Sequence, residues 1–152
     1  MSNREITIAV DAMGGEGSPL KVLKGAEIFT NKNPDVDIIF FGNEAKINSC
    51  INNENLKIRN FKIFETSDDV KDQDNANIIL RSRKNSSIYK GLELIKNRNN
   101  LGFVSAGNTA ALMILSRLHL GMIDGIDRPA ICSLIPNKND FSIMLDLGAN
   151  VS

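Results

Sequence analysis

The 152-residue sequence has no excess of charge of either sign, because 18 Lys and Arg are balanced by 18 Asp and Glu. It therefore has neither a broad basic field for nucleic acid nor an acidic tail. Apolar runs are short as well. The first, Ile6 to Val10, stops at Asp11, too soon for a signal peptide, and no run approaches the roughly eighteen residues of a membrane span. We expect a cytoplasmic protein without a nucleic-acid partner, in contact with membranes at most peripherally.

Cysteine and histidine are scarce, with two Cys and one His. Cys50 and Cys132 lack the C-x-x-C spacing of metal or redox sites, so we expect small buried thiols and no structural metal. His119 falls near the end of a predicted helix, where a structural position is favoured over a catalytic one. Since there is one histidine and no G-x-S-x-G, covalent hydrolase chemistry is not indicated. The G-x-G-x-x-G and Walker nucleotide motifs are also missing.

The stretch Leu101 to Leu120 predicts a strand, a tight turn and a helix. The turn is the small-residue run Ser105 to Thr109, which places Asn108 or Thr109 at the N-cap of the helix. Unpaired N–H groups and the positive end of the helix dipole favour an anion or an oxyanion there. The alternative is that Gly107 serves only the turn and Thr109 only caps the helix. Spacing alone leaves both interpretations open.

Strand and helix patterns alternate along the rest of the chain. Strands are predicted at 6–10, 36–41, 61–64, 130–135 and 141–147, and helices at 44–51, 76–81, after Ser86-Ser87, and from Ser18-Pro19, with serine as N-cap and proline at the first helical position. The last two strands, separated by a turn at 137–140, must be antiparallel. This order predicts one α/β domain over residues 1–152, a three-layer α/β/α sandwich with a mainly parallel, Rossmann-like sheet.

Three glycine-containing loops follow apolar strands: Asp11 to Gly15, Ser105 to Thr109 and Asp146 to Asn150. In parallel sheets, ligands bind beyond the carboxyl ends of the strands. Glycine lets backbone N–H groups approach a ligand closely, and Asn or Thr supplies directional hydrogen bonds. We therefore expect these loops to share one binding site. The acidic loop Thr66 to Asp74 has the character of a solvated connection, although its place after a strand puts it on the same edge.

Basic residues gather between 81 and 90, at Arg81, Arg83, Lys84 and Lys90. Beside the helix start at Ser86-Ser87, such a cluster could hold phosphate or an acidic partner. A solvated run of charge is the alternative.

Four blocks of the sequence resemble the PlsX family of phosphate acyltransferases. They are IAVDAMGGEGSP (8–19), FVSAGNTAALM (103–113), GIDRPAI (125–131) and LDLGAN (145–150), and they occur in the order found in that family. LRSRKNSS (80–87) also resembles the basic stretch of the family. Members of the family are about twice as long and continue past this point into a second half. The chain thus resembles the N-terminal half of a PlsX protein.

The resemblance implies a fold related to the isocitrate and isopropylmalate dehydrogenases. It also implies transfer of a fatty acyl group from acyl carrier protein to inorganic phosphate, giving acyl phosphate for phospholipid synthesis, with no organic cofactor or metal. The protein is expected as a homodimer or with a complementing C-terminal half. Phosphate is already nucleophilic, so the protein need only hold the anion near the thioester and stabilise the oxyanion.

The resemblance also suggests roles for particular residues. Asn108, Lys84 and Asp146 are the candidate catalytic residues. The candidate substrate- and phosphate-binding residues are Asp11, Gly14, Gly15, Arg81, Ser105, Gly107, Thr109, Gly148 and Asn150. Two other functions remain open: a noncatalytic fragment that binds a partner through an incomplete sheet edge, and an enzyme of the phosphate acetyltransferase or dehydrogenase type.

Overall fold

The computed structural model describes residues 6–68, 70, 71, 74, 76–96, 98 and 101–146. Its centre is a four-stranded sheet in the order β3-β2-β1-β4. The strands are β1 (Thr7–Asp11), β2 (Asp37–Gly42), β3 (Phe61–Glu65) and β4 (Leu101–Val104). All three pairings are parallel. The alternation of strands and helices in the sequence predicted this sheet correctly.

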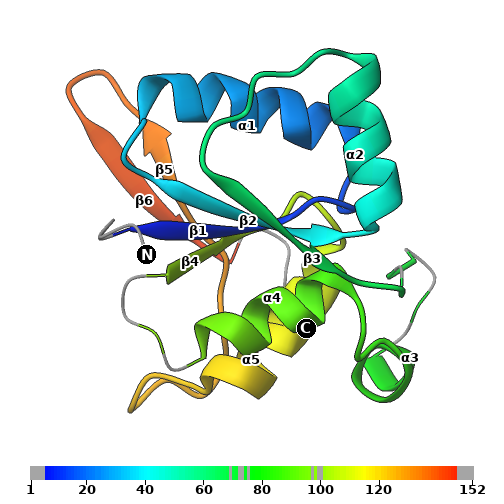
Figure 1. Ribbon diagram of the computed structural model, residues 1–152. Coiled ribbons are helices and arrows are strands. Elements are labelled where there is room, and N and C mark those ends of the chain that lie inside the picture. Colours follow the sequence, from blue (N-terminus) through cyan, green and yellow to red (C-terminus); the bar gives the residue numbers. More distant parts are fainter. Residues whose placement is uncertain are drawn as a thin grey trace.

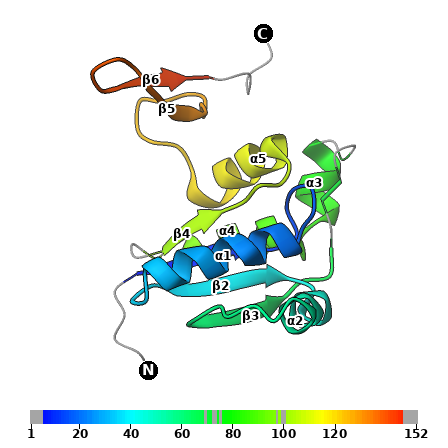
Figure 2. The same ribbon diagram turned by 90° about the horizontal axis from the view of Figure 1, so that it is seen from above.

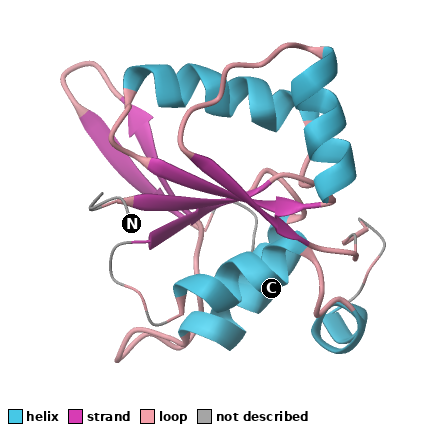
Figure 3. Ribbon diagram, viewed as in Figure 1, coloured by secondary structure: helices cyan, strands magenta, loops and turns pink. Residues whose placement is uncertain are grey.

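Helices cover both faces of the sheet (Figures 1 and 3). α1 (Leu20–Lys32) and α2 (Glu44–Asn53) lie on one face, and α4 (Ser87–Ile95) and α5 (Thr109–Leu120) lie on the other, where the short α3 (Ala76–Ser82) packs beside α5. The predicted three-layer α/β/α arrangement is confirmed.

Each face has its own hydrophobic core. On the α1 side, Val10 and Phe40 from the strands pack with Leu23 and Ile47 from the helices. On the other side, Leu92 of α4 and Leu115 of α5 pack against Phe103 of β4. Because strands buried on both faces need apolar side chains in both directions, they occur in the sequence as nearly continuous apolar runs.

The last two strands form a separate ribbon. Among the described strands, β5 (Cys132–Pro136) and β6 (Phe141–Leu145) pair only with each other, in the antiparallel sense that the short turn required. Figure 2 shows this ribbon standing away from the four-stranded sheet, beyond α5. Asp146, directly after β6, therefore lies at the end of the ribbon and not at the edge where β1 and β4 end, and the rest of that predicted turn lies outside the described residues. An apolar strand pattern indicates pairing but does not select the partner.

Three local predictions also need correction. Pro19, not Ser18, occupies the N-cap of α1, because the Ser18 hydroxyl donates to the carbonyl of Gly14 instead. His119 lies in the last turn of α5 as expected, but it is only 8% exposed and packs edge-on against the Tyr89 ring. Cys132 is exposed rather than buried, and Cys50 is partly buried.

Among the described helices, none has the length and apolar character needed to cross a membrane.

Candidate functional site

A cavity of about 540 Å³ opens where β1 and β4 end. We call it the loop cavity. Two of the predicted loops form most of it, since β1 and β4 are parallel neighbours and both end at this edge. The lining residues are Asp11, Met13, Gly14, Gly15, Glu16, Val70, Lys71, Ser87, Ile88, Ala106, Gly107 and Asn108.

A chain of hydrogen bonds connects the two loops. The hydroxyl of Ser105 donates to Oδ2 of Asp11 at 2.7 Å, and Oδ1 of Asp11 accepts from the N–H of Met13 at 3.0 Å. The N–H of Gly107 donates to the Ser105 hydroxyl oxygen at 3.0 Å. Asp11 is 1% exposed, so its carboxylate acts within the protein as an acceptor that holds both loops. The Gly107 N–H, expected to bind an anion, is engaged by Ser105 instead.

The close approach of the loops explains why glycine occupies two of the positions. A Cβ at Gly14 would lie 2.3 Å from Oδ2 of Asp11 and 2.8 Å from the nitrogen of Gly107. Gly15 has a φ of +89°, and a Cβ there would lie 2.7 Å from the carbonyl oxygen of Ala106. Any larger residue would push the loops apart. Both glycines were predicted from the sequence, and both line the cavity.

Two helix N-termini meet at the loop cavity. Asn108 caps α5, with its side-chain oxygen accepting from the N–H of Ala111 at 2.8 Å. Ser86 caps α4 by accepting from the N–H of Tyr89 at 3.3 Å. Asn108 itself and Ser87, the first residue of α4, line the cavity, and Thr109 follows as the first residue of α5. The first N–H groups of a helix lack intrahelical acceptors and carry the positive dipole end, so this geometry favours an anion.

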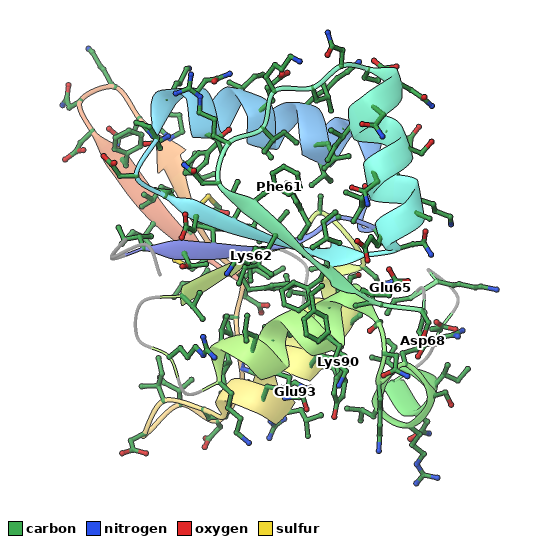
Figure 4. The ribbon with its side chains drawn as sticks, in the orientation of Figure 1. Phe61, Lys62, Glu65, Asp68, Lys90 and Glu93 are labelled. Carbon is green, nitrogen blue, oxygen red and sulfur yellow. The ribbon has the colours of Figure 1, made fainter. Side chains whose placement is uncertain are left out.

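Lys71 is the only cation among the described residues that line the cavity. It lies in the loop after β3, which is held against the start of α4: a carboxylate oxygen of Asp68 accepts from the N–H of Asn85 at 3.0 Å (Figure 4). Sequence reasoning missed Lys71 because its loop is acidic overall. The available signal was the position of that loop on the shared sheet edge.

The basic cluster is not part of the cavity. Arg81 and Lys84 are exposed, and neither lines it. The Arg83 guanidinium contacts Asp74 at 2.8 Å and lowers the pKa of that carboxyl from 3.8 to about 2. Lys90 pairs with Glu93 on α4 at 2.9 Å (Figure 4). Positive charge in this segment therefore pairs with acids or faces solvent.

Of the third predicted loop, only Asp146 lies within the described residues. Asp146 follows β6, and its N–H donates to the carbonyl of Ile131 at 2.8 Å, within the ribbon. It does not line the cavity. Gly148 and Asn150 lie outside the described residues.

Comparison with known proteins identifies a family for the chain. The profile of the family described as "Fatty acid synthesis protein" matches residues 6–152. A phosphate acyltransferase from Pelagibacter ubique is 40% identical over 146 residues, covering 96% of this chain and 43% of the relative. One from Rhodospirillum rubrum is 38% identical over 150 residues, covering 99% of this chain and 43% of the relative.

A third relative, the phosphate acyltransferase of Wolbachia pipientis subsp. Culex pipiens, is 40% identical over 153 residues, covering 98% of this chain and 44% of its own length. The chain thus spans less than half the length of these curated relatives. The family match nevertheless includes all four strands of the sheet and both loops of the cavity. The chain therefore belongs to the fatty acid synthesis protein family, together with these phosphate acyltransferases.

Proposed function

We propose that this chain forms the phosphate-binding part of an acyltransferase that moves a fatty acyl group from acyl carrier protein to inorganic phosphate. A phosphate oxygen attacks the thioester carbonyl carbon. A carbon–oxygen bond forms, the carbon–sulfur bond breaks, and the carrier thiol leaves with a proton. The acyl phosphate would then serve phospholipid synthesis. One observation carries the proposal: two glycine loops and two helix N-termini enclose the same cavity.

The phosphate anion is held by backbone donors and one side-chain cation. Ser87 and Ile88 at the start of α4 and Asn108 at the N-cap of α5 line the cavity, and Lys71 adds positive charge. Asn108 uses its side-chain oxygen for capping, which leaves its amide group to donate to phosphate or to the oxyanion. Such preorganised donors stabilise the tetrahedral intermediate without first having to reorient. Thr109 supplies a further N–H in the first turn of α5. Asp11 and Ser105 position the loops.

The described lining of the loop cavity does not include Arg81, Lys84 or Asp146. The proposal therefore assigns no role in phosphate binding to these three residues. The proposal therefore rests on the Asp11 to Gly15 and Ser105 to Thr109 loops, on the start of α4 and on Lys71.

Completion of the enzyme by a partner is part of the proposal. β4 is an edge strand, and the β5–β6 ribbon exposes large apolar side chains, including Leu134, Ile143 and Leu145. Edge strands and apolar patches of this kind are typical of surfaces that bind another polypeptide. We propose that a second copy of the chain, or the part of the relatives that this chain does not match, covers them.

The direct test combines the purified chain with acyl carrier protein carrying a fatty acyl group and with inorganic phosphate. Acyl phosphate formation is measured with and without the unmatched part of the Pelagibacter ubique relative. Formation of acyl phosphate in either mixture, and its loss without inorganic phosphate, supports the proposal. If both mixtures are inactive but the two polypeptides bind each other, the noncatalytic partner-binding function is the better description.

A further inference from the structure

A second, apolar cavity lies between α1 and the sheet. Its volume is about 330 Å³. We call it the α1 groove. Its lining residues are Ile8, Val10, Asp11, Val22, Gly25, Ala26, Phe29, Ile38, Val104 and Ala106. Asp11 is the only charged side chain among them.

The groove and the loop cavity lie next to each other, because Asp11 and Ala106 line both. Val104, two residues before Ala106, lines the groove and is 55% exposed, although it is apolar. A polar, anion-favouring cavity thus adjoins an apolar one at the carboxyl ends of β1 and β4. This pairing fits a ligand that has an anionic head and a hydrocarbon tail.

Helix α1 presents a stripe of small and apolar residues to the groove. Val22, Gly25, Ala26 and Phe29 follow the spacing of one helix face. Gly25 lies in the interior of α1, where glycine weakens a helix relative to alanine. A Cβ built at Gly25 meets nothing within 4 Å, so no close contact among the described residues requires glycine there. A larger side chain at this position would instead occupy the groove.

We infer that the α1 groove holds the hydrocarbon chain of the acyl substrate. The reacting carbonyl group then lies near the junction at Asp11 and Ala106, beside the anion in the loop cavity. This inference rests on the proposed function, because it needs an acyl ligand and a phosphate site. Burial of methylene groups against Val10, Val22 and Phe29 would give the site its preference for long chains.

Alkyl phosphates separate the two cavities experimentally, because they carry an anionic head and a tail of chosen length. Binding of dodecyl phosphate, butyl phosphate and inorganic phosphate to the purified chain is measured by calorimetry. We expect the dodecyl compound to bind at least about tenfold more tightly than the butyl compound. In Gly25→Leu this preference should fall to less than about threefold, while inorganic phosphate binds as before.

Two variants serve as controls. Asn31→Leu adds the same side chain at an exposed position of α1 outside the groove and should keep the full chain-length preference. Gly25→Ala adds only a methyl group and favours the helix, so it should keep most of the preference and report any effect of backbone change. Circular dichroism establishes that each variant is folded.

The outcomes separate this inference from the proposed function. If dodecyl and butyl phosphate bind equally tightly and inorganic phosphate still binds, the α1 groove does not hold the hydrocarbon chain. The proposed phosphate site would be unaffected by that result. A chain-length preference that survives in folded Gly25→Leu would place the tail elsewhere, for example on the β5–β6 ribbon, and would also overturn it. If none of the three ligands binds, both the hydrocarbon site in the α1 groove and the proposed phosphate site are contradicted.

Discussion

Ser105 and Asp11 are 94 positions apart in the sequence, yet the Ser105 hydroxyl donates to the Asp11 carboxylate at 2.7 Å. The contact joins the loops that follow β4 and β1 and is part of the wall of the loop cavity. Because Ser105 also accepts from the N–H of Gly107, this one hydroxyl connects a buried acid to the turn that leads into α5. The integrity of the site should therefore depend on it.

Replacing Ser105 with alanine should destabilise the protein and weaken anion binding. The Asp11 carboxylate is buried and loses a donor, so the free energy of unfolding should fall by roughly 1–3 kcal/mol. Urea denaturation measures this change, and calorimetry measures the affinity for inorganic phosphate. Ser82→Ala, at an exposed position, should change neither the free energy of unfolding nor the affinity for phosphate by more than the experimental error. Equal stability of the two variants would show that the Ser105 contact contributes little.

Gly14→Ala should disrupt the loop cavity, because the added Cβ would lie 2.3 Å from Oδ2 of Asp11. We expect a loss of about 1–3 kcal/mol in unfolding free energy and at least tenfold weaker binding of phosphate, where tenfold corresponds to about 1.4 kcal/mol. Gly102→Ala in β4 is the matched control, since a Cβ there meets nothing within 4 Å. Unchanged phosphate affinity in Gly14→Ala would argue against a site between these loops.

Asn108→Ala tests whether the N-terminus of α5 binds the anion. Asn43 caps α2 in the same way, by accepting from the N–H of Lys46 at 2.9 Å, but it does not line the loop cavity. Both alanine variants should lose about 1 kcal/mol of stability with their caps. Only Asn108→Ala should also weaken phosphate binding and lower acyl phosphate formation. Similar functional losses in both variants would mean that stability alone is responsible.

His119 should make the stability depend on pH just below neutrality. Burial lowers its pKa from the ordinary value of 6.5, and its Nε2 has no hydrogen-bond partner in the described structure. As the pH falls below 6.5, the unfolded chain binds a proton that the folded protein resists, so the free energy of unfolding decreases. Urea denaturation at pH 7.5 and at about pH 5.5 should show this decrease in the parent.

The matched variant for this experiment is His119→Phe, which keeps an aromatic ring beside Tyr89 and removes the titrating group. Its stability should change less between the two pH values. The lowered pKa values of Asp74 and Glu93 act in a separate, more acidic range, below their ordinary values of 3.8 and 4.5. The same pH dependence in parent and variant would exclude His119 as its source.

The β5–β6 ribbon should promote self-association of the chain. Leu134 and Ile143 are cross-strand partners and are 64% and 67% exposed. Ile143→Lys removes apolar surface and adds charge, so sedimentation velocity should show less oligomer at high concentration than in the parent. Asn139→Lys adds the same charge at the exposed ribbon turn without removing apolar surface and should behave like the parent. An unchanged oligomer distribution in Ile143→Lys would point to another surface.

Much of the fold was predictable because it depends on local patterns. Apolar runs predict the strands β1, β2 and β4. Capping residues predict the helix starts at Asn108 and Ser86, and the short turn between β5 and β6 predicts their antiparallel pairing. The partner of the ribbon was not predictable, because the apolar alternation of β6 is the same whether this chain or another covers it. For similar reasons the sequence predicted burial of Cys132, which the structure contradicts.

The site was predictable where it follows from strand adjacency. Loops after neighbouring parallel strands must meet, and this brought Gly14 and Gly107 together as expected. Lys71 was missed because the path of an irregular loop depends on tertiary contacts such as the one between Asp68 and Asn85. The pairing of Arg83 with Asp74 could not be deduced from composition, and the roles suggested for Arg81 and Lys84 stay predictions.

The strand order has a kinetic consequence. Among the described strands of the main sheet, β1 comes first in the sequence and β4 comes last, yet they are neighbours. Their pairing closes the longest loop in that sheet, and contacts distant in sequence form slowly. During refolding, the chain should therefore gain affinity for phosphate only when β1 and β4 pair. Phosphate binding would then follow this late pairing step and not the early collapse of the unfolded chain.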